Sequence, residues 1–175
     1  MTHVAEMTTV DTVLGALTIV ASKTALVGVY LPDHAPAPNL ARCRRVDHSP
    51  VLDTARRELL ADLAGSRSAF TVPLALEGTT TQRAVWRALL DIPRGETRTY
   101  GALAAQLGRP RAARAIGHAG ARNPLSIVVP CDRVVGVGGA LRGFAGGLER
   151  KAALLSLDRA AASSRSRVPC TPCQP

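Results

Sequence analysis

The segment TYGALAAQLGRPRAARAIGHAGA, residues 99–121, predicts two short helices joined by a tight turn. Residues 99–107 are rich in alanine and favour a helix, and the triplet Gly108-Arg109-Pro110 ends it, because glycine and proline both interrupt helices. A second helical run covers residues 112–121. Two short helices around a turn that contains glycine are typical of the helix-turn-helix motif, which places its second helix against DNA.

Basic residues surround this segment. Residues 94–122 hold six arginines and one acidic residue, Glu96. The whole chain has a formal net charge of +9 at pH 7, and the entire excess lies in residues 76–175, which hold fifteen basic and six acidic side chains. This asymmetry favours an anionic partner, nucleic acid first and a membrane surface second. On charge alone, an arginine-rich genome with a basic tail explains the same numbers equally well.

The flanking sequence predicts a mainly helical C-terminal domain over residues 77–160. Threonines at positions 79–81 cap an amphipathic helix that runs to residue 90. The apolar run at residues 125–129 predicts a strand, because β-branched residues favour strands. A glycine-rich loop then precedes a last helix at residues 148–157. Beyond it, residues 161–175 are rich in Ser, Arg and Pro, which predicts a disordered tail.

The first 76 residues predict a small α/β domain. An apolar run at residues 10–20, interrupted near Gly15, and a second run at residues 26–30 predict a β-hairpin. Three prolines at positions 32–38 block both helix and strand, so this stretch is expected to be a loop. Apolar residues then recur with helical spacing over residues 51–64.

Length and composition exclude several classes of protein. No apolar run approaches the ~20 residues of a membrane span. The first residues lack the pattern of a secretory signal, and four scattered cysteines are too few for a disulfide framework, so a cytoplasmic protein is expected. Cys170 and Cys173 form a C-x-x-C pair without a second pair to complete four zinc ligands. We therefore expect no metal site and interpret this pair as redox-sensitive.

Cys131 follows the apolar run and precedes the glycine-rich loop. A lone cysteine in such a place is most often a small buried apolar residue. A nucleophilic cysteine needs a base or positive surroundings to become a thiolate, and Asp132 and Arg133 are its neighbours in the chain. Position in the sequence leaves both interpretations open.

Residues 79–158 resemble the O6-alkylguanine-DNA alkyltransferases, also called methylated-DNA–protein-cysteine methyltransferases, in motif order and spacing. The motifs that carry the resemblance are Gln82-Arg83-Ala84-Val85-Trp86, Ile92-Pro93-Arg94-Gly95-Glu96-Thr97, Tyr100-Gly101, Arg114-Ala115-Ile116-Gly117, Arg122-Asn123-Pro124, Ile127-Val128-Val129-Pro130-Cys131 and Gly143-Phe144-Ala145-Gly146-Gly147-Leu148. The resemblance implies a ribonuclease-H-like α/β N-terminal domain and a C-terminal domain that carries the helix-turn-helix and the cysteine.

The resemblance also implies a single-use reaction without a cofactor. A monomer would bind the minor groove of double-stranded DNA and flip an O6-alkylguanine into a pocket, with O4-alkylthymine as a second candidate substrate. Cys131 matches the thiolate that takes the alkyl group, and Asn123 matches the asparagine that braces the turn around the cysteine. Tyr100 matches the tyrosine that contacts both the flipped nucleotide and its phosphate.

Further positions match the DNA-binding and base-binding parts of the family. Arg114 matches the arginine that fills the space left by the flipped base. The remaining DNA-contact positions are Ala115, Gly117 and Arg122. Val134, Ala145 and Gly146 match positions around the base. Without the motif order, Arg114 could equally be one more solvated arginine, and Tyr100 could be a residue that packs on the core.

One position departs from the family pattern. The family motif is Pro-Cys-His-Arg-Val, whereas this chain reads Pro130-Cys131-Asp132-Arg133-Val134. The family histidine takes the thiol proton and is held by a glutamate, whose position matches Asp158 here. An ordinary carboxylate is a far weaker base than imidazole. Two neighbouring carboxylates can share a proton and raise one pKa, although a negative charge beside the thiol opposes the thiolate.

Two functions therefore remain open at the level of sequence. The first is alkyl transfer with an altered proton relay through Asp132 and Asp158. The second is a protein that binds the lesion without transferring the alkyl group. A transcription regulator that uses only the helix-turn-helix is a weaker third reading, because it leaves Cys131 and the glycine-rich loop without a role.

Overall fold

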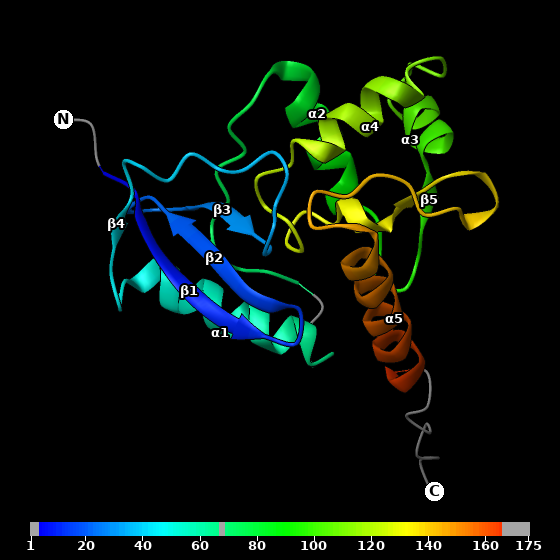
Figure 1. Ribbon diagram of the computed structural model, residues 1–175. Coiled ribbons are helices and arrows are strands. Elements are labelled where there is room, and N and C mark those ends of the chain that lie inside the picture. Colours follow the sequence, from blue (N-terminus) through cyan, green and yellow to red (C-terminus); the bar gives the residue numbers. More distant parts are fainter. Residues whose placement is uncertain (1–3, 67–68, 166–175) are drawn as a thin grey trace, which may run out of the picture.

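The computed structural model describes residues 4–66 and 69–165 of the chain. A sheet with one helix forms the N-terminal half, and a group of short helices forms the C-terminal half (Figure 1). The two halves pack together, since Val29 donates a backbone hydrogen bond to Pro124 and Ala35 donates one to Ala145. The expected domain boundary at residues 76–77 falls in the segment that joins the two halves. That the halves are separate domains remains a prediction.

The N-terminal sheet has the strand order β3-β2-β1-β4. Its strands are β1 (Glu6–Thr12), β2 (Gly15–Ala21), β3 (Leu26–Tyr30) and β4 (Arg44–Arg45). The first three are antiparallel neighbours, and β4 runs parallel to β1. The predicted hairpin is therefore a three-stranded meander: the run at residues 10–20 reverses at Val13 and Leu14, where Gly15 has a φ of 99° that favours glycine.

Helix α1 (Pro50–Leu63) packs against β1 and β2, as the apolar spacing predicts. Its buried face includes Leu52, Ala55 and Leu59. Glu58 is also buried there, and its carboxylate accepts hydrogen bonds from the backbone N–H groups of Thr71 and Val72. Glu58 therefore attaches the connecting segment at residues 71–72 to α1.

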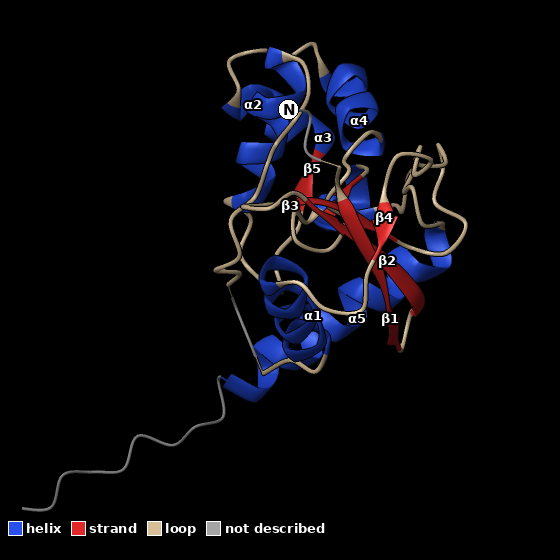
Figure 2. Ribbon diagram, turned by 90° about the vertical axis from the view of Figure 1, so that its left-hand side faces the viewer, coloured by secondary structure: helices blue, strands red, loops and turns tan. Residues whose placement is uncertain are grey.

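The two short helices predicted around a glycine-containing turn are present as α3 (Tyr100–Gln106) and α4 (Ala113–Ala121), which pack together (Figure 2). We call this segment the helix-turn-helix, and its contact with DNA stays a prediction. Helix α2 (Thr80–Leu90) lies against α4, and the buried Trp86 donates its indole N–H to the carbonyl of Ala119 at 2.9 Å. Its expected cap is present as a capping box, in which Thr79 and Gln82 bond each other's backbone N–H groups.

The predicted strand at residues 125–129 is wrong. Leu125 makes an isolated bridge to Val29, and the four residues after it form turns, with Ile127 at a φ of 73°. Asn123 explains this shape, because its side chain accepts from the N–H of Leu125 and donates to the carbonyl of Val129. The apolar residues are buried in the core without a partner strand.

The last helix is longer than expected. Helix α5 (Leu148–Arg165) continues eight residues past the predicted end at residue 157, so residues 161–165 are helical rather than part of a disordered tail. Ala161 is buried, and glycines at positions 65 and 95 let the chain approach Ala161 and Ala162 closely. Among residues 4–66 and 69–165, no helix combines the length and apolar character needed to cross a membrane.

Candidate active site

Cys131 begins a single 3-10 turn, Cys131–Arg133, directly after the buried loop that Asn123 closes. The thiol is 7% exposed, and its sulfur accepts a hydrogen bond from Nδ2 of Asn123 at 3.3 Å. The same Nδ2 donates to the carbonyl of Val129 at 2.8 Å. Asn123 therefore holds both the loop and the sulfur in place, consistent with the bracing role expected for it.

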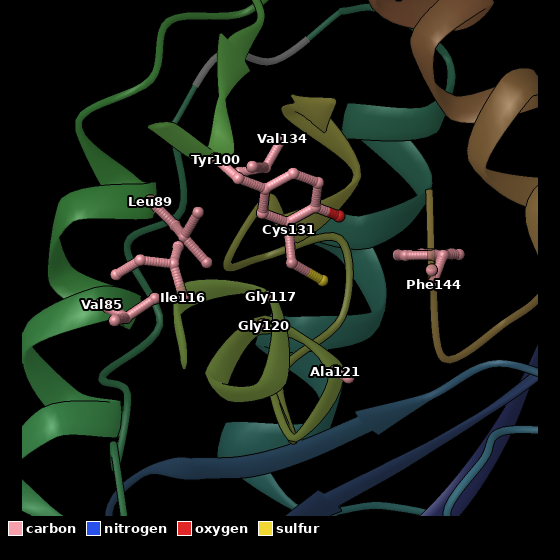
Figure 3. Close-up of a pocket in the computed structure, with 11 residues that line it drawn as sticks. Val85, Leu89, Tyr100, Ile116, Gly117, Gly120, Ala121, Cys131, Val134 and Phe144 are labelled. Carbon is pink, nitrogen blue, oxygen red and sulfur yellow. The ribbon is translucent and has the colours of Figure 1, made fainter. Parts of the chain in front are cut away.

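A narrow cleft lies in front of the sulfur (Figure 3). It is lined by Val85, Leu89, Tyr100, Ile116, Gly117, Gly120, Ala121, Cys131, Val134, Gly143 and Phe144. Tyr100 projects across the cleft, and its hydroxyl donates to the carbonyl of Arg142 at 3.1 Å. The free volume is about 10 Å³, so a purine base can enter only if the lining residues move.

The expected base-pocket residues do not all lie in this cleft. Val134 lines it, whereas Ala145 and Gly146 are absent from its wall. Ala145 accepts a hydrogen bond from the N–H of Ala35, and Gly146 packs against Leu31. The chain turns toward the N-terminal half after Phe144, which leaves Gly143 and Phe144 as the lining residues from this segment.

Lys151 is a site residue that the sequence interpretation missed. Its side chain is 0% exposed, and Nζ donates to the carbonyls of Val134 at 2.6 Å and Arg142 at 2.7 Å. The ammonium group also lies 5.9 Å from the centre of the Tyr100 ring. Because Lys151 and Tyr100 both bond the Arg142 carbonyl, together they hold the edge of the cleft. A signal was available, because a lysine is rare in this arginine-rich chain and Lys151 lies among apolar residues of α5.

Asp132 and Asp158 are both buried, but they have different partners. Oδ1 of Asp158 accepts from Nε of Arg94 at 2.9 Å, and Oδ2 accepts from Nε of Arg133 at 2.6 Å. Asp158 is thus an anion held between two cations. Arg94 also pairs with Asp62 of α1 at 3.3 Å, and none of the ion pairs among the described residues includes Asp132. Among the described residues no hydrogen bond joins the two carboxylates, although the charge of Asp158 helps raise the pKa of Asp132, so the sharing of a proton between them stays a prediction.

The surroundings shift two pKa values at the site. Burial and, to a smaller extent, the charge of Asp132 together raise the pKa of the Cys131 thiol to about 12, although Asn123 and Lys151 oppose them. Forming the thiolate at pH 7 therefore costs on the order of 7 kcal/mol. Burial also raises the pKa of Asp132 to about 6, with Arg133 opposing and Asp158 adding to that shift. Asp132 is mostly ionised at neutral pH, yet it binds a proton more readily than an ordinary aspartate.

The helix-turn-helix presents an exposed basic surface. Its exposed arginines are Arg98, Arg109, Arg111, Arg114 and Arg122, and Ala115 is exposed beside Arg114 on α4. Gly117 faces Tyr100 instead, because a Cβ at this position would lie 3.5 Å from the Tyr100 ring. Arg94 does not contribute to this surface, since its side chain is 8% exposed and forms ion pairs inside the protein.

Among the described residues, no group of three or more His, Cys, Asp or Glu side chains is arranged to hold a metal ion. Cys170 and Cys173, the C-x-x-C pair interpreted as redox-sensitive, lie outside the described residues.

Comparisons with known proteins place the chain in a family. Residues 80–160 match "6-O-methylguanine DNA methyltransferase, DNA binding domain". The chain is 44% identical to a methylated-DNA–protein-cysteine methyltransferase of Mycolicibacterium paratuberculosis, covering 88% of this chain and 92% of that protein. It is 40% identical to a constitutive enzyme of the same name from Bacillus subtilis, over 87% of this chain and 94% of that one.

A solved structure of Mycobacterium tuberculosis OGT in complex with DNA matches with a TM-score of 0.83 and 39% identity, covering 89% of this chain and 94% of that chain. The O6-methylguanine methyltransferase structure from the same organism gives the same TM-score over 95% of this chain and 96% of that one. Both matches extend through the N-terminal half, which the family match at residues 80–160 does not cover. The chain therefore belongs to the 6-O-methylguanine DNA methyltransferase family.

Proposed function

We propose that this protein repairs DNA directly by transferring the alkyl group of O6-alkylguanine to Cys131. Repair by alkyl transfer to a cysteine is the activity carried in the names of its relatives. In the reaction the carbon–oxygen bond to guanine breaks and a carbon–sulfur bond forms, which leaves a thioether at Cys131. The sulfur gives up its proton and the departing guanine takes up one proton at a ring nitrogen, so no proton is gained or lost overall. The thioether is stable, so each molecule acts once. The observation that carries the proposal is the sulfur of Cys131 held by Asn123 at the base of a cleft opposite Tyr100.

Intact mass spectrometry tests this proposal. The protein is incubated with duplex DNA that contains one O6-methylguanine, and a matched duplex with guanine is the control. We expect the protein to gain the mass of one methyl group only with the lesion, in proportion to the DNA supplied. Tight binding of the lesion without any gain in mass would instead establish the second candidate function, binding without transfer. The raised pKa of Cys131 is the observation that favours that candidate.

We infer that the exposed arginines of the helix-turn-helix dock on DNA phosphates from the minor-groove side. Helix α4 presents Arg114 next to Gly117, and Gly117 lines the cleft that contains Cys131. An arginine at this place can occupy the gap that a flipped base leaves. Flipping costs a few kcal/mol, and less for a poorly paired lesion. The cleft must widen to accept the base, and the glycine-rich segment that ends at Gly143 is the part of its wall best suited to move.

DNA binding is expected to weaken steeply with salt. If all five exposed arginines of the helix-turn-helix neutralise phosphates, a plot of log affinity against log salt has a slope of about −4.5. The change Arg114→Ala should lower affinity and make this slope about one unit shallower. Fluorescence anisotropy with a labelled duplex measures both quantities. Arg57→Ala, at an exposed position on α1, is the matched control and should leave the slope unchanged. Equal effects of the two changes would contradict docking through α4.

We propose that Asp132 accepts the thiol proton during transfer. Its raised pKa makes it a stronger base than an ordinary aspartate, and its negative charge helps raise the pKa of Cys131, the next residue in the same turn. Because the thiol pKa lies far above that of Asp132, the proton must move as the sulfur attacks rather than beforehand. The proposal predicts slow transfer compared with a site that holds a histidine at this position.

The rate of transfer is expected to depend on the ionisation of Asp132. Its pKa is raised to about 6, so the base form is lost as pH falls through that value. The single-turnover rate should fall about tenfold per pH unit below pH 6 and level off above about pH 7. Quenched-flow measurements with lesion-containing DNA at constant ionic strength give this profile. A rate that keeps rising tenfold per unit to pH 9 would show attack by a pre-formed thiolate without help from Asp132.

A further inference from the structure

Helix α4 forms one side of the cleft in front of Cys131. The residues of α4 that line the cleft are Ile116, Gly117, Gly120 and Ala121. They share one face of the helix, because an α-helix has about 3.6 residues per turn, and the two glycines lie in the middle of that face. A side chain at position 120 would therefore point into the cleft, and glycine leaves that place empty (Figure 3).

The two glycines of α4 have different surroundings. A Cβ at Gly117 would lie 3.5 Å from the ring of Tyr100, so the tyrosine already occupies that side of the helix. A Cβ at Gly120 would have no heavy atom of the described residues within 4 Å outside its own stretch of α4. Glycine destabilises the interior of a helix relative to alanine. No close neighbour requires glycine at position 120, and its effect is to keep the cleft open there.

The open space at Gly120 is close to the nucleophile. The carbonyl of Gly120 accepts a hydrogen bond from the N–H of Asn123 at 3.1 Å, and Nδ2 of Asn123 donates to the sulfur of Cys131 at 3.3 Å. The indole N–H of Trp86 donates to the carbonyl of Ala119 at 2.9 Å. These bonds hold the end of α4 from two sides. Because the helix is held there, it is not free to move inward and fill the space.

The other side chains around the cleft are larger and mostly apolar. The bulky apolar residues among them are Val85, Leu89, Ile116, Val134 and Phe144. Such a wall favours a hydrocarbon substituent over a charged one, because burying an unpaired charge is costly. During transfer the reacting carbon lies between the sulfur and the guanine oxygen, so further carbons of the alkyl group need space beside the sulfur. Gly120 leaves space at that place.

We propose that Gly120 lets the cleft accept apolar alkyl groups larger than methyl, such as benzyl, and so determines how strongly the protein discriminates between alkyl groups by size. The inference rests on the proposed alkyl transfer and adds the size of the group to it. The bonds are those of methyl transfer: the carbon–oxygen bond of the benzyl group breaks, a carbon–sulfur bond forms at Cys131, and guanine takes up one proton as the sulfur loses one. The base is the same in both reactions, so a change at Gly120 should act on the alkyl group.

Single-turnover transfer from two duplexes tests this inference. The duplexes carry O6-methylguanine or O6-benzylguanine at the same position, and intact mass spectrometry follows the fraction of protein that gains each group. The unmodified protein should transfer both groups. Gly120→Leu should slow benzyl transfer at least about tenfold more than methyl transfer, because a single methylene changes such discrimination by ~10–200-fold. Gly120→Ala should shift the ratio of the two rates less, in the same direction, and alanine preserves the helix.

Gly101→Ala is the matched control, because it makes the same change at an exposed position of α3 that does not line the cleft. It should leave the ratio of the two rates unchanged. Equal losses of methyl and benzyl transfer in the Gly120 variants would overturn the inference, and so would an unmodified protein that transfers methyl but not benzyl. An unmodified protein that transfers neither group would instead contradict the proposed function, so the two failures are distinguishable.

Discussion

Replacing Cys131 with serine is expected to abolish alkyl transfer while leaving DNA binding intact. Serine keeps the size of the side chain and its place beside Asn123, but a hydroxyl is a much weaker nucleophile than a thiol and forms its anion less readily. Intact mass spectrometry after incubation with O6-methylguanine DNA should show no added methyl group. Anisotropy should show affinity for the same duplex close to that of the unmodified protein.

Cys43 provides the matched control for this experiment. It is the other free cysteine among the described residues, and it lies in the N-terminal half, away from the cleft. Cys43→Ser should transfer as fast as the unmodified chain. If the Cys131→Ser protein still gains a methyl group, another residue is the acceptor. If only the Cys43→Ser protein fails to gain one, Cys43 is the acceptor.

Replacing Asp132 with histidine is expected to speed transfer by up to about tenfold, mainly through the change in charge. A neutral imidazole removes the negative charge that helps raise the pKa of Cys131. The ordinary pKa of imidazole, ~6.5, lies only slightly above the value of about 6 for Asp132, so base strength adds little. The single-turnover rate at pH 7.5 measures the gain in transfer rate. A thermal melt measures any loss of folding stability.

Asp132→Asn separates the two effects, because it removes the charge without supplying a base. We expect its rate to fall below that of the unmodified chain, since the proton then has no acceptor. A rate that matches Asp132→His would mean that the charge of Asp132 only hinders the thiol. A histidine variant that is folded but no faster would mean that the carboxylate site has its own working geometry.

The parts of the fold that were predictable depend on local patterns. The cap at Thr79, the apolar face of α1 and the glycine turn after α3 each follow from residues within a few positions of one another. The run at residues 125–129 failed for the opposite reason. Its apolar, β-branched composition predicted a strand, but the side chain of Asn123 closes it into a buried loop, and composition alone does not distinguish the two.

Some residues of the candidate site were likewise predictable from the sequence, and others were not. Motif order indicated Cys131, Tyr100 and Asn123. The structure places Tyr100 and Cys131 in the wall of one cleft and Asn123 in hydrogen-bond contact with the Cys131 sulfur. Ala145 and Gly146 carried the same kind of motif signal yet lie beside the N-terminal half. The burial of Arg94 could not be read from the run of arginines in which it stands, because its partners lie 32 and 64 positions away.

The sequence alone therefore predicts two short helices around a glycine turn and an excess of arginine there, and it identifies the cysteine and the unusual aspartate after it, because each is a local pattern or a residue identity. Folding in three dimensions establishes what these residues can do. It buries Cys131 and Asp132, places Asp158 between two arginines and brings Lys151 to the edge of the cleft. Proton affinity and access depend on such distant neighbours, since burial and nearby charges set pKa values and neither follows from chain order.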